Sequence, residues 1–247
     1  MISELNADSL ERIVPEEIRT EGATASETIE LHLERYAFAR RHLVPGTLLD
    51  MACGVGYGTA ALASGNPHVS TAVGVDVSQA AVDYARRRYE NGHISFESAD
   101  ALTYAPGVRF DNIVSLETVE HVEDPVMLFA RFSELLAPGG RLIASVPVTP
   151  SVDANPHHKS NFTVATFQRL AAPHALKLLG RLDQTQPFNP VALARKTEPR
   201  AHGMRRGMTR FYIEHPSHFF LRLWSTLADG FVNKYVTLAW GRESGDR

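Results

Sequence analysis

Short apolar runs alternate with segments of helical pattern along the chain as far as residue 147. The runs are found at residues 47–51, 69–77, 93–98, 110–116 and 141–146. Brief apolar runs of this kind are typical of buried strands. Strands that alternate with helices predict an α/β fold built on a parallel, doubly wound sheet.

The segments between these runs carry helix signals at their ends. Residues 27–42 have an apolar stripe opposite a charged face, and the Pro-Gly pair after Val44 ends that helix. Ser78 is a suitable N-cap, and Pro125 stands at the first position of a helix, where proline is tolerated. The predicted helices are 27–42, the segment from a glycine-rich turn to residue 64, 79–91 and 125–136.

The pattern is looser beyond residue 147. In order, it predicts a loop at 147–161, a helix at 163–172, a strand at 175–182, a loop at 184–203, a mostly helical stretch at 204–230 interrupted near Pro216, and a last strand at 235–240. The stretch at 204–230 is rich in basic and aromatic residues. It suits a helix pair packed on the sheet or in a dimer, a lid or wall of a substrate-binding site, or a helix at a membrane surface.

The chain of 247 residues has the length of one α/β domain with a modest insertion. We expect a single domain over residues 1–247. Within it, residues 1–44 form an N-terminal helical arm or lid, 45–183 and 235–240 form the core, and 184–234 form a helical insertion that caps the substrate-binding site.

Acidic residues stand at the ends of four predicted strands, namely Asp50, Asp76, Asp100 and Glu117. Right-handed crossovers bring the carboxyl ends of parallel strands to one edge of the sheet, where open α/β sheets bind their ligands. We therefore expect these acids to surround one site. An acid after the second strand can accept hydrogen bonds from both ribose hydroxyls of a nucleoside.

A glycine-rich turn follows the first strand with the spacing G-x-G-x-G at Gly54, Gly56 and Gly58. Glycine permits unusual backbone angles and lets a ligand approach the backbone closely. The dinucleotide fingerprint is G-x-G-x-x-G or G-x-G-x-x-A, and this turn misses it by register. The turn therefore favours a nucleoside cofactor without a pyrophosphate over NAD.

Composition excludes several classes of protein. The formal net charge is -3 with neutral histidines, whereas general nucleic-acid binding needs a strong basic excess. Cys53 is the sole cysteine, which rules out an internal disulfide and fits a reducing compartment. Because the sequence has neither a 20-residue apolar run nor a basic, apolar leader, we expect a cytoplasmic protein.

Five segments in order resemble class I S-adenosylmethionine-dependent methyltransferases: LLDMACGVGYG, VGVDVS, ESADAL, FDNIVSLETVEHVEDP and LLAPGGRLIASVP. They span residues 48–147. The resemblance implies a Rossmann-like sheet of seven strands whose last strand is antiparallel. Two shorter segments, ERIVP at 11–15 and HLERYAFA at 32–39, look similar to methyltransferases of glycans and secondary metabolites, in which such a region covers the cofactor.

The resemblance also assigns cofactor contacts for S-adenosylmethionine and its product S-adenosylhomocysteine. It implies that Asp50 lies near the methionine amino group, and that Ala52, Gly54 and Gly56 line the methionine part through their backbone. It implies that Asp76 binds the ribose, while Val77, Asp100 and Ala101 contact adenine. Leu116 and Glu117 would border the sulfonium side.

Candidates for catalysis are three histidines. His121 lies in the EHVEDP segment, and His157 and His158 follow the fifth strand, where methyltransferases often place groups that bind the acceptor. A histidine in each place can serve as a base, order its loop or face solvent. Since the histidines are dispersed and no zinc-type Cys/His cluster is present in the sequence, we expect no metal site.

The sequence favours an enzyme that moves a methyl group by direct displacement to an oxygen or nitrogen of a small metabolite, such as a heteroaromatic ring, a sugar or another secondary metabolite. The alternatives are a methyltransferase for a lipid-linked glycan or quinone at a membrane surface, and a protein that binds S-adenosylmethionine without catalysis. A nucleic-acid enzyme is disfavoured because Leu116 to Val119 replace the D/N-P-P-Y loop of base-amino methyltransferases. We expect a small-molecule acceptor, no nucleic-acid partner, and a monomer or homodimer.

Overall fold

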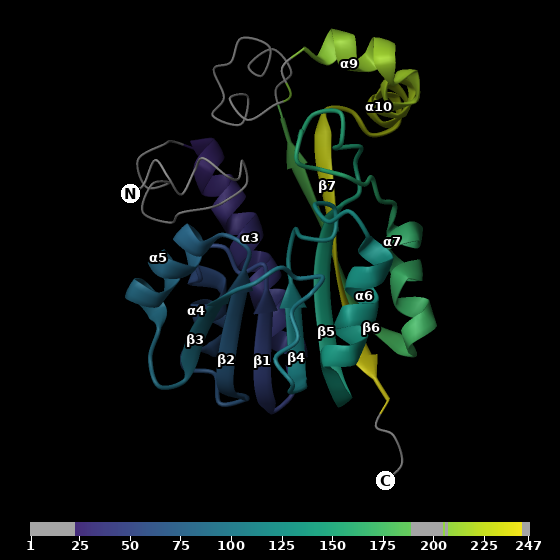
Figure 1. Ribbon diagram of the computed structural model, residues 1–247. Coiled ribbons are helices and arrows are strands. Elements are labelled where there is room, and N and C mark those ends of the chain that lie inside the picture. Colours follow the sequence, from purple (N-terminus) through teal and green to yellow (C-terminus); the bar gives the residue numbers. More distant parts are fainter. Residues whose placement is uncertain (1–22, 189–204, 206, 244–247) are drawn as a thin grey trace.

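The computed structural model describes residues 23–188, 205 and 207–243 (Figure 1). The expectations for residues 1–22, including the segment at 11–15, and for most of the predicted loop at 184–203 lie outside the described residues.

One seven-stranded sheet forms the centre of the molecule, with the strand order β3-β2-β1-β4-β5-β7-β6 (Figure 1). Neighbouring strands from β3 through β5 are parallel, and β7 is antiparallel to both β5 and β6. The predicted doubly wound sheet with an antiparallel last strand is confirmed. The strands are β1 (Gly46–Met51), β2 (Val69–Asp76), β3 (Ile94–Ser98), β4 (Phe110–Ser115), β5 (Leu136–Pro147), β6 (Leu176–Pro187) and β7 (Val232–Arg242).

Helices connect the strands close to the places that the sequence predicts. The Ser78 hydroxyl accepts a hydrogen bond from the Ala81 amide, and the Asp124 carboxylate accepts one from the Met127 amide at 2.9 Å. These caps satisfy amide groups that a helix start leaves without intrahelical partners. The described helices are α3 (Ala23–His42), α4 (Tyr57–Ala63), α5 (Gln79–Tyr89), α6 (Pro125–Leu135), α7 (Val164–Ala171), the 3-10 turn η1 (Ala172–His174), α9 (Met208–Glu214) and α10 (Pro216–Asp229).

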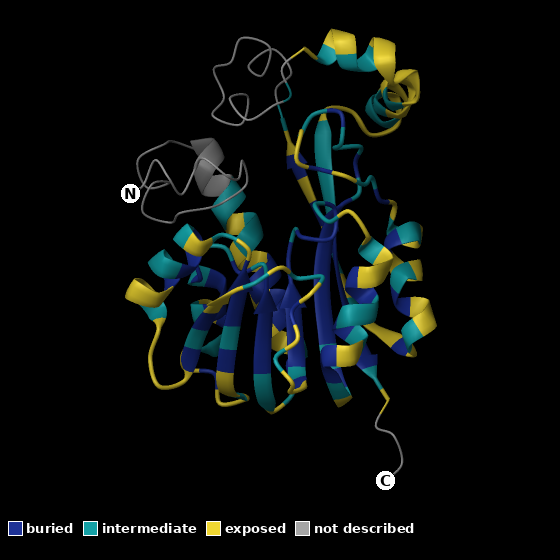
Figure 2. Cartoon of the chain, in the orientation of Figure 1, coloured by how far each residue is buried: buried dark blue, intermediate teal, exposed yellow. Residues whose placement is uncertain are grey.

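Two apolar cores form on the two faces of the sheet, because side chains alternate along each strand. In β1, Leu48 packs toward α3, α4 and α5, whereas Leu49 packs toward α6 and α7. Trp240 of β7 is fully buried in the second core against Phe129 and Phe167. Figure 2 shows the sheet as the buried centre between helices whose outer faces are exposed.

The last two strands are longer than the sequence predicts. β6 continues to Pro187 and β7 begins at Val232, whereas the predicted strands cover 175–182 and 235–240. Three prolines between residues 184 and 203 predict a loop there, yet Gln184 and Gln186 are buried in β6. Residues 184–187 and 232–234, which the sequence assigns to the insertion, therefore belong to strands.

The start of β5 also differs from the prediction. The sequence predicts this strand at 141–146, but β5 begins at Leu136. The pairing with β4 shifts register across this segment, and Gly139 has a φ of 77°. The segment from Pro138 to Gly140 is therefore an irregularity inside a longer strand.

Among the residues that the structure describes, none of the helices is long and apolar enough to cross a membrane.

Candidate functional site

The strand order places a topological switch between β1 and β4. The chain continues from β1 to β2 on one side and from β4 to β5 on the other. The crossovers leave in opposite directions and open a crevice at the carboxyl ends of these strands, where ligands bind in such sheets. The predicted cofactor residues Ala52 to Gly56 and Leu116 to Glu117 follow β1 and β4 directly.

The glycine-rich turn has one glycine that faces open space. Gly54 has a φ of 56°, and no described atom lies within 4 Å of the position that a Cβ would take there. A Cβ at Gly56 would lie 2.7 Å from Ala85 and Phe96, and one at Gly58 would lie 2.0 Å from Tyr36. Gly56 and Gly58 therefore permit close packing inside the protein, while Gly54 leaves a surface that a ligand can approach.

Asp76 joins this turn to the start of α5. Its carboxylate accepts hydrogen bonds from the Gly54 amide at 2.9 Å and from the Ser78 amide at 2.9 Å. The side chain is largely buried, at 8% exposure. A carboxylate in this position fixes the turn and retains lone pairs that can accept further hydrogen bonds.

Asp50 is buried in β1, directly behind the turn. The Thr59 hydroxyl donates a hydrogen bond of 2.6 Å to its carboxylate. Burial raises the pKa of Asp50 to about 7, and the charge of Asp76 adds to the rise, while the bond from Thr59 opposes it. The sequence analysis did not single out Thr59, although it stands at the start of the helix that follows the glycines.

The edge next to the turn carries the residues predicted to meet adenine. Val77 is 72% exposed, which is unusual for an apolar side chain at the end of a buried strand. Asp100 is exposed, and one of its carboxylate oxygens accepts a hydrogen bond of 2.7 Å from the Leu102 amide. Ala101 beside it is half-buried. Val77 and Asp100 thus offer an apolar surface and an acceptor at the same edge.

Glu117 lies on the β4 side of the crevice in a left-handed conformation, with a φ of 51°. Its amide donates to Ser145 Oγ at 2.9 Å, and that hydroxyl donates to Glu117 Oε1 at 2.6 Å. Leu116 before it is buried. A non-glycine residue in this conformation is costly unless its surroundings hold it there, and Ser145 provides two such bonds.

Arg35 connects α3 to this side of the site. Its guanidinium is buried, lies 3.5 Å from Glu117 Oε1, and donates to Gln184 Oε1 at 2.7 Å. It also stacks 4.4 Å above the ring of Tyr235. The buried Arg35 cation therefore binds α3 to the loop after β4, to β6 and to β7. The segment at 32–39 that resembles methyltransferases contains Arg35, but nothing in its pattern distinguishes this residue, because a single arginine on an amphipathic helix looks like a solvent-facing charge.

The structure brings two of the three candidate histidines together. The rings of His121 and His158 are 4.6 Å apart in an edge-to-face contact, although the two residues follow different strands. Glu120, which the sequence analysis did not single out, lies beside them. His157 is exposed and is not in this group.

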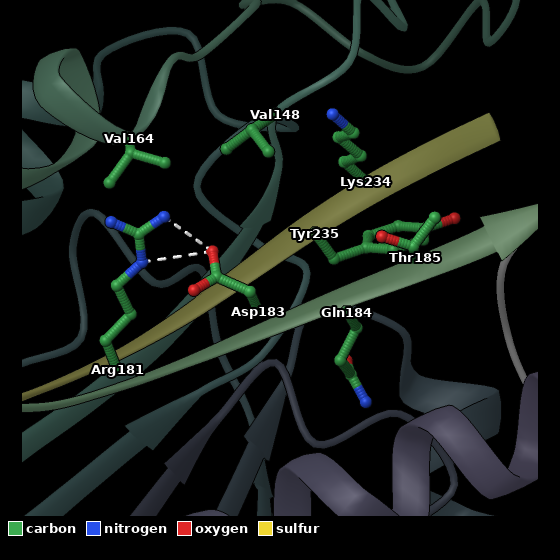
Figure 3. A pocket seen from close by; sticks show the side chains of 8 residues that line it. All are labelled: Val148, Val164, Arg181, Asp183, Gln184, Thr185, Lys234 and Tyr235. Carbon is green, nitrogen blue, oxygen red and sulfur yellow. Dashed lines mark hydrogen bonds and ion pairs between the residues drawn. The ribbon is translucent and has the colours of Figure 1, made fainter. Parts of the chain in front are cut away.

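A hollow of about 340 Å³ lies along β6 and β7, and Figure 3 shows its lining side chains. Arg181 and Asp183 form an ion pair of 2.6 Å at one end of it. The lining residues differ from every predicted cofactor residue, so the hollow is separate from the glycine-rich turn. They are Val148, Val164, Arg181, Asp183, Gln184, Thr185, Lys234 and Tyr235.

A buried ion pair holds the inserted helices to the loop after β5. Asp153 is fully buried and accepts bonds from Arg222 of α10 at 2.8 and 2.9 Å and from the Tyr212 hydroxyl of α9 at 2.7 Å. Burial alone would raise the pKa of Asp153, but the hydrogen bonds and charge of Arg222 outweigh it and leave the pKa below its usual value. Part of the basic, aromatic segment is thus structural.

A family model described as "Methyltransferase domain" matches residues 49–144. The chain is 31% identical over 154 residues to a ubiquinone biosynthesis O-methyltransferase of Aromatoleum aromaticum, and the match covers 60% of this chain and 60% of that protein. Curated relatives such as this one are therefore matched over less than two thirds of their length.

Two solved structures share the fold across most of the chain. The N-methyltransferase NodS of Bradyrhizobium japonicum in complex with S-adenosylhomocysteine has a TM-score of 0.62 at 17% identity, with 97% of both chains covered. The [4+2]-cyclase SpnF has a TM-score of 0.63 at 19% identity, covering 90% of this chain and 85% of SpnF. At these identities the likeness concerns the fold, which serves more than one reaction.

Proposed function

We propose a methyl-transfer reaction for this chain because it belongs to the class I S-adenosylmethionine-dependent methyltransferases. S-adenosylmethionine is the cofactor of that family, and S-adenosylhomocysteine is its product. The acceptor in our proposal is an oxygen or nitrogen atom of a small metabolite, such as a heteroaromatic ring, a sugar or another secondary metabolite.

The observation that carries the proposal is the open face of Gly54 between two carboxylates. No described atom fills the space where its Cβ would stand, and the carboxylate of Asp76 is bonded to its amide. Asp50 is buried behind the same turn with a pKa raised to about 7, mainly by burial. A ligand with a cationic amino group and a ribose suits this arrangement, because an ammonium offsets a buried carboxylate and ribose hydroxyls donate to the second one.

The residues that would hold the cofactor follow from this fit and from the family resemblance. Asp50 would face the amino group, and the backbone of Ala52, Gly54 and Gly56 would line the methionine part. Asp76 would accept from the ribose. The remaining contacts would come from Val77, Asp100 and Ala101 around adenine, and from Leu116 and Glu117 on the sulfonium side.

When bound, the cofactor supplies a methyl group that its sulfonium already activates. The chain then has to align the acceptor atom with that methyl group and exclude water, since orientation accounts for much of the rate in such displacements. His121 and His158 lie on the loops after β4 and β5, at the edge of the sheet that carries Leu116. There they can accept a proton from a hydroxyl acceptor.

The transfer itself can be tested before the acceptor is identified. We expect label from methyl-labelled S-adenosylmethionine to enter the low-mass fraction of a cell extract when the purified chain is added. Asp76→Ala should abolish most of this transfer, while Asp83→Ala, which changes a half-buried acid on the surface of α5, should retain it. Label found mainly in nucleic acid or protein would contradict a small-molecule acceptor, and cofactor binding without any transfer would favour the non-catalytic alternative.

A second candidate function is methylation of a quinone or lipid-linked glycan at a membrane surface. Helix α10 exposes a row of apolar side chains, with Trp224 at 75% and Leu227 at 74% exposure. Exposed apolar patches of this kind mark interaction surfaces, and amphipathic helices with aromatic residues bind the bilayer interface. The resemblance to an enzyme named for ubiquinone biosynthesis supports the same candidate.

This candidate predicts binding to vesicles. The chain should co-sediment with vesicles of phosphatidylcholine and phosphatidylglycerol, and Trp224→Glu combined with Leu227→Glu should remove that binding. Val108→Glu, which changes an exposed apolar residue in a loop far along the sequence, serves as the matched control. Equal sedimentation of all three proteins would rule out α10 as the membrane contact.

A further inference from the structure

Glu120, His121 and His158 form a compact group of metal-binding side chains. One ligand atom from each lies within 4.8 Å of the others. Glu120 and His158 are buried and His121 is half-buried. The loop after β4 supplies the first two residues and the loop after β5 supplies the third, so two parallel strands bring together residues that are dispersed in the sequence.

Backbone hydrogen bonds fix the two loops against each other. The amide of Lys159, next to His158, donates to the Glu120 carbonyl at 2.7 Å, and the Ser160 amide donates to the same oxygen at 3.3 Å. On the other loop, the His121 amide donates to the Thr118 carbonyl at 3.0 Å. Backbone hydrogen bonds therefore hold the loop that carries Glu120 and His121 against the loop that carries His158.

A second hydrogen bond orients His158. Its Nδ1 lies 2.7 Å from Ser151 Oγ. Metal-binding histidines commonly engage their other ring nitrogen in such a bond, which fixes the tautomer and the orientation of the ring. Ser151 thus makes Nε2 the ring nitrogen of His158 that is suited to a metal.

We propose that Glu120, His121 and His158 bind one divalent transition-metal cation of the Zn²⁺ type. Two imidazoles and one carboxylate form a ligand set used by catalytic zinc sites, which keep a fourth position open. Tetrahedral bonds of about 2.1 Å place the ligand atoms about 3.4 Å apart. The present group thus needs only a small closure of its side chains to bind such an ion.

The open coordination position of the metal could bind the methyl acceptor, an inference that rests on the proposed function. Glu120 and His121 lie on the same loop as Leu116 and Glu117, which the cofactor assignment places at the sulfonium side. With the metal bound, His121 and His158 act as its ligands and not as bases, and a hydroxyl that takes the open position would lose its proton to solvent more readily. Its oxygen would then form the bond to the methyl carbon, while the carbon–sulfur bond breaks and its electron pair remains on sulfur. This preference selects hydroxyl acceptors over amines.

The metal site can be tested in the absence of cofactor and acceptor. After treatment with a chelator and buffer exchange, the purified chain is titrated with Zn²⁺ alone in a calorimeter. We expect one equivalent to bind. Glu120→Gln and His158→Ala should each lose that equivalent, and Ser151→Ala should bind about 10- to 100-fold more weakly.

His157→Ala is the matched control, because it removes the neighbouring, exposed histidine and should retain the equivalent. Glu120→Gln preserves the size of the side chain, and circular dichroism checks its fold if His158→Ala does not fold. Failure of the unaltered chain to bind Zn²⁺ would overturn the site, as would full binding by folded Glu120→Gln.

A separate titration with S-adenosylhomocysteine keeps the two proposals distinguishable. Normal binding of S-adenosylhomocysteine without Zn²⁺ binding would overturn only the metal site. Zn²⁺ binding that depends on Glu120, without any S-adenosylhomocysteine binding, would support the metal site and overturn the proposed function.

Discussion

Asp50 illustrates how burial sets the chemistry of a single residue. Within the part of the chain that the structure describes, its buried carboxyl accepts a hydrogen bond from Thr59 and has Asp76 as a neighbouring charge. Burial without a cationic partner favours the protonated form. Without a ligand, the pKa of about 7 therefore leaves much of Asp50 neutral near physiological pH.

This state of Asp50 predicts that cofactor binding releases a proton. An ammonium group beside the carboxyl would lower its pKa, so the affinity for S-adenosylhomocysteine should rise as the pH increases from about 5 to 7 and level off above that range. The slope should approach tenfold per pH unit for one proton. Calorimetry in buffers of different ionisation enthalpy measures the proton directly. A pH-independent affinity, or one unchanged in slope in Asp50→Asn, would exclude Asp50 from the amino-group site.

At the scale of the elements, α3 is a fixed part of the core over its described length. Arg35, Tyr36, Phe38 and Ala39 are buried, and Gln184 of β6 donates to the Leu31 carbonyl and to Glu34 Oε2 while accepting from Arg35. The arm that the sequence analysis assigned to residues 1–44 therefore includes a helix that is packed on the sheet.

Gln184→Ala should destabilise the protein by about 1–3 kcal/mol, because it leaves buried polar groups on α3 without their partner. Denaturation by urea measures the free energy of unfolding. Arg181→Ala in the same strand removes an exposed ion pair and should cost at most about 1 kcal/mol. Equal effects of the two substitutions would contradict a structural role for Gln184.

The pair of Asp153 and Arg222 sets the position of α9 and α10 relative to the loop after β5. Arg222→Met should cost about 3–5 kcal/mol near pH 7, because it leaves a fully buried carboxylate without its cation. Arg210→Met, which removes an exposed pair with Glu214 on α9, should cost at most about 1 kcal/mol.

The cost of Arg222→Met should depend on pH with a definite sign. The native pKa of Asp153 lies below that of the unfolded chain, so its stabilising effect is complete above about pH 4 and is lost as the pH falls further. Unfolding followed by circular dichroism at pH 3 and pH 7 compares the two proteins. A difference between them that grows on acidification would contradict the assigned ion pair.

For the molecule as a whole, the sequence was informative where local patterns carry the signal. Alternating strands and helices predicted the parallel sheet, which is confirmed. Acids at the strand ends predict a site at the carboxyl edge of that sheet. The sequence was uninformative where partners are distant in the chain. Two such pairs are Arg35 with Gln184 and Glu120 with His158, whose members meet only after the sheet has formed. The hydrophobic pattern around one member of a pair does not predict which residue its partner is. The length of β6 was underestimated for a related reason, since the prolines from residue 187 onward predict a loop until the partners of Gln184 on α3 are known.

The cofactor itself is the central claim, and one titration tests it most directly. Calorimetry of the purified chain should show one equivalent of S-adenosylhomocysteine bound and little or no binding of NAD, because the turn at Gly54 has the open backbone face but not the glycine register of a pyrophosphate site. Binding of NAD as tight as that of S-adenosylhomocysteine, or tighter, would contradict the claim.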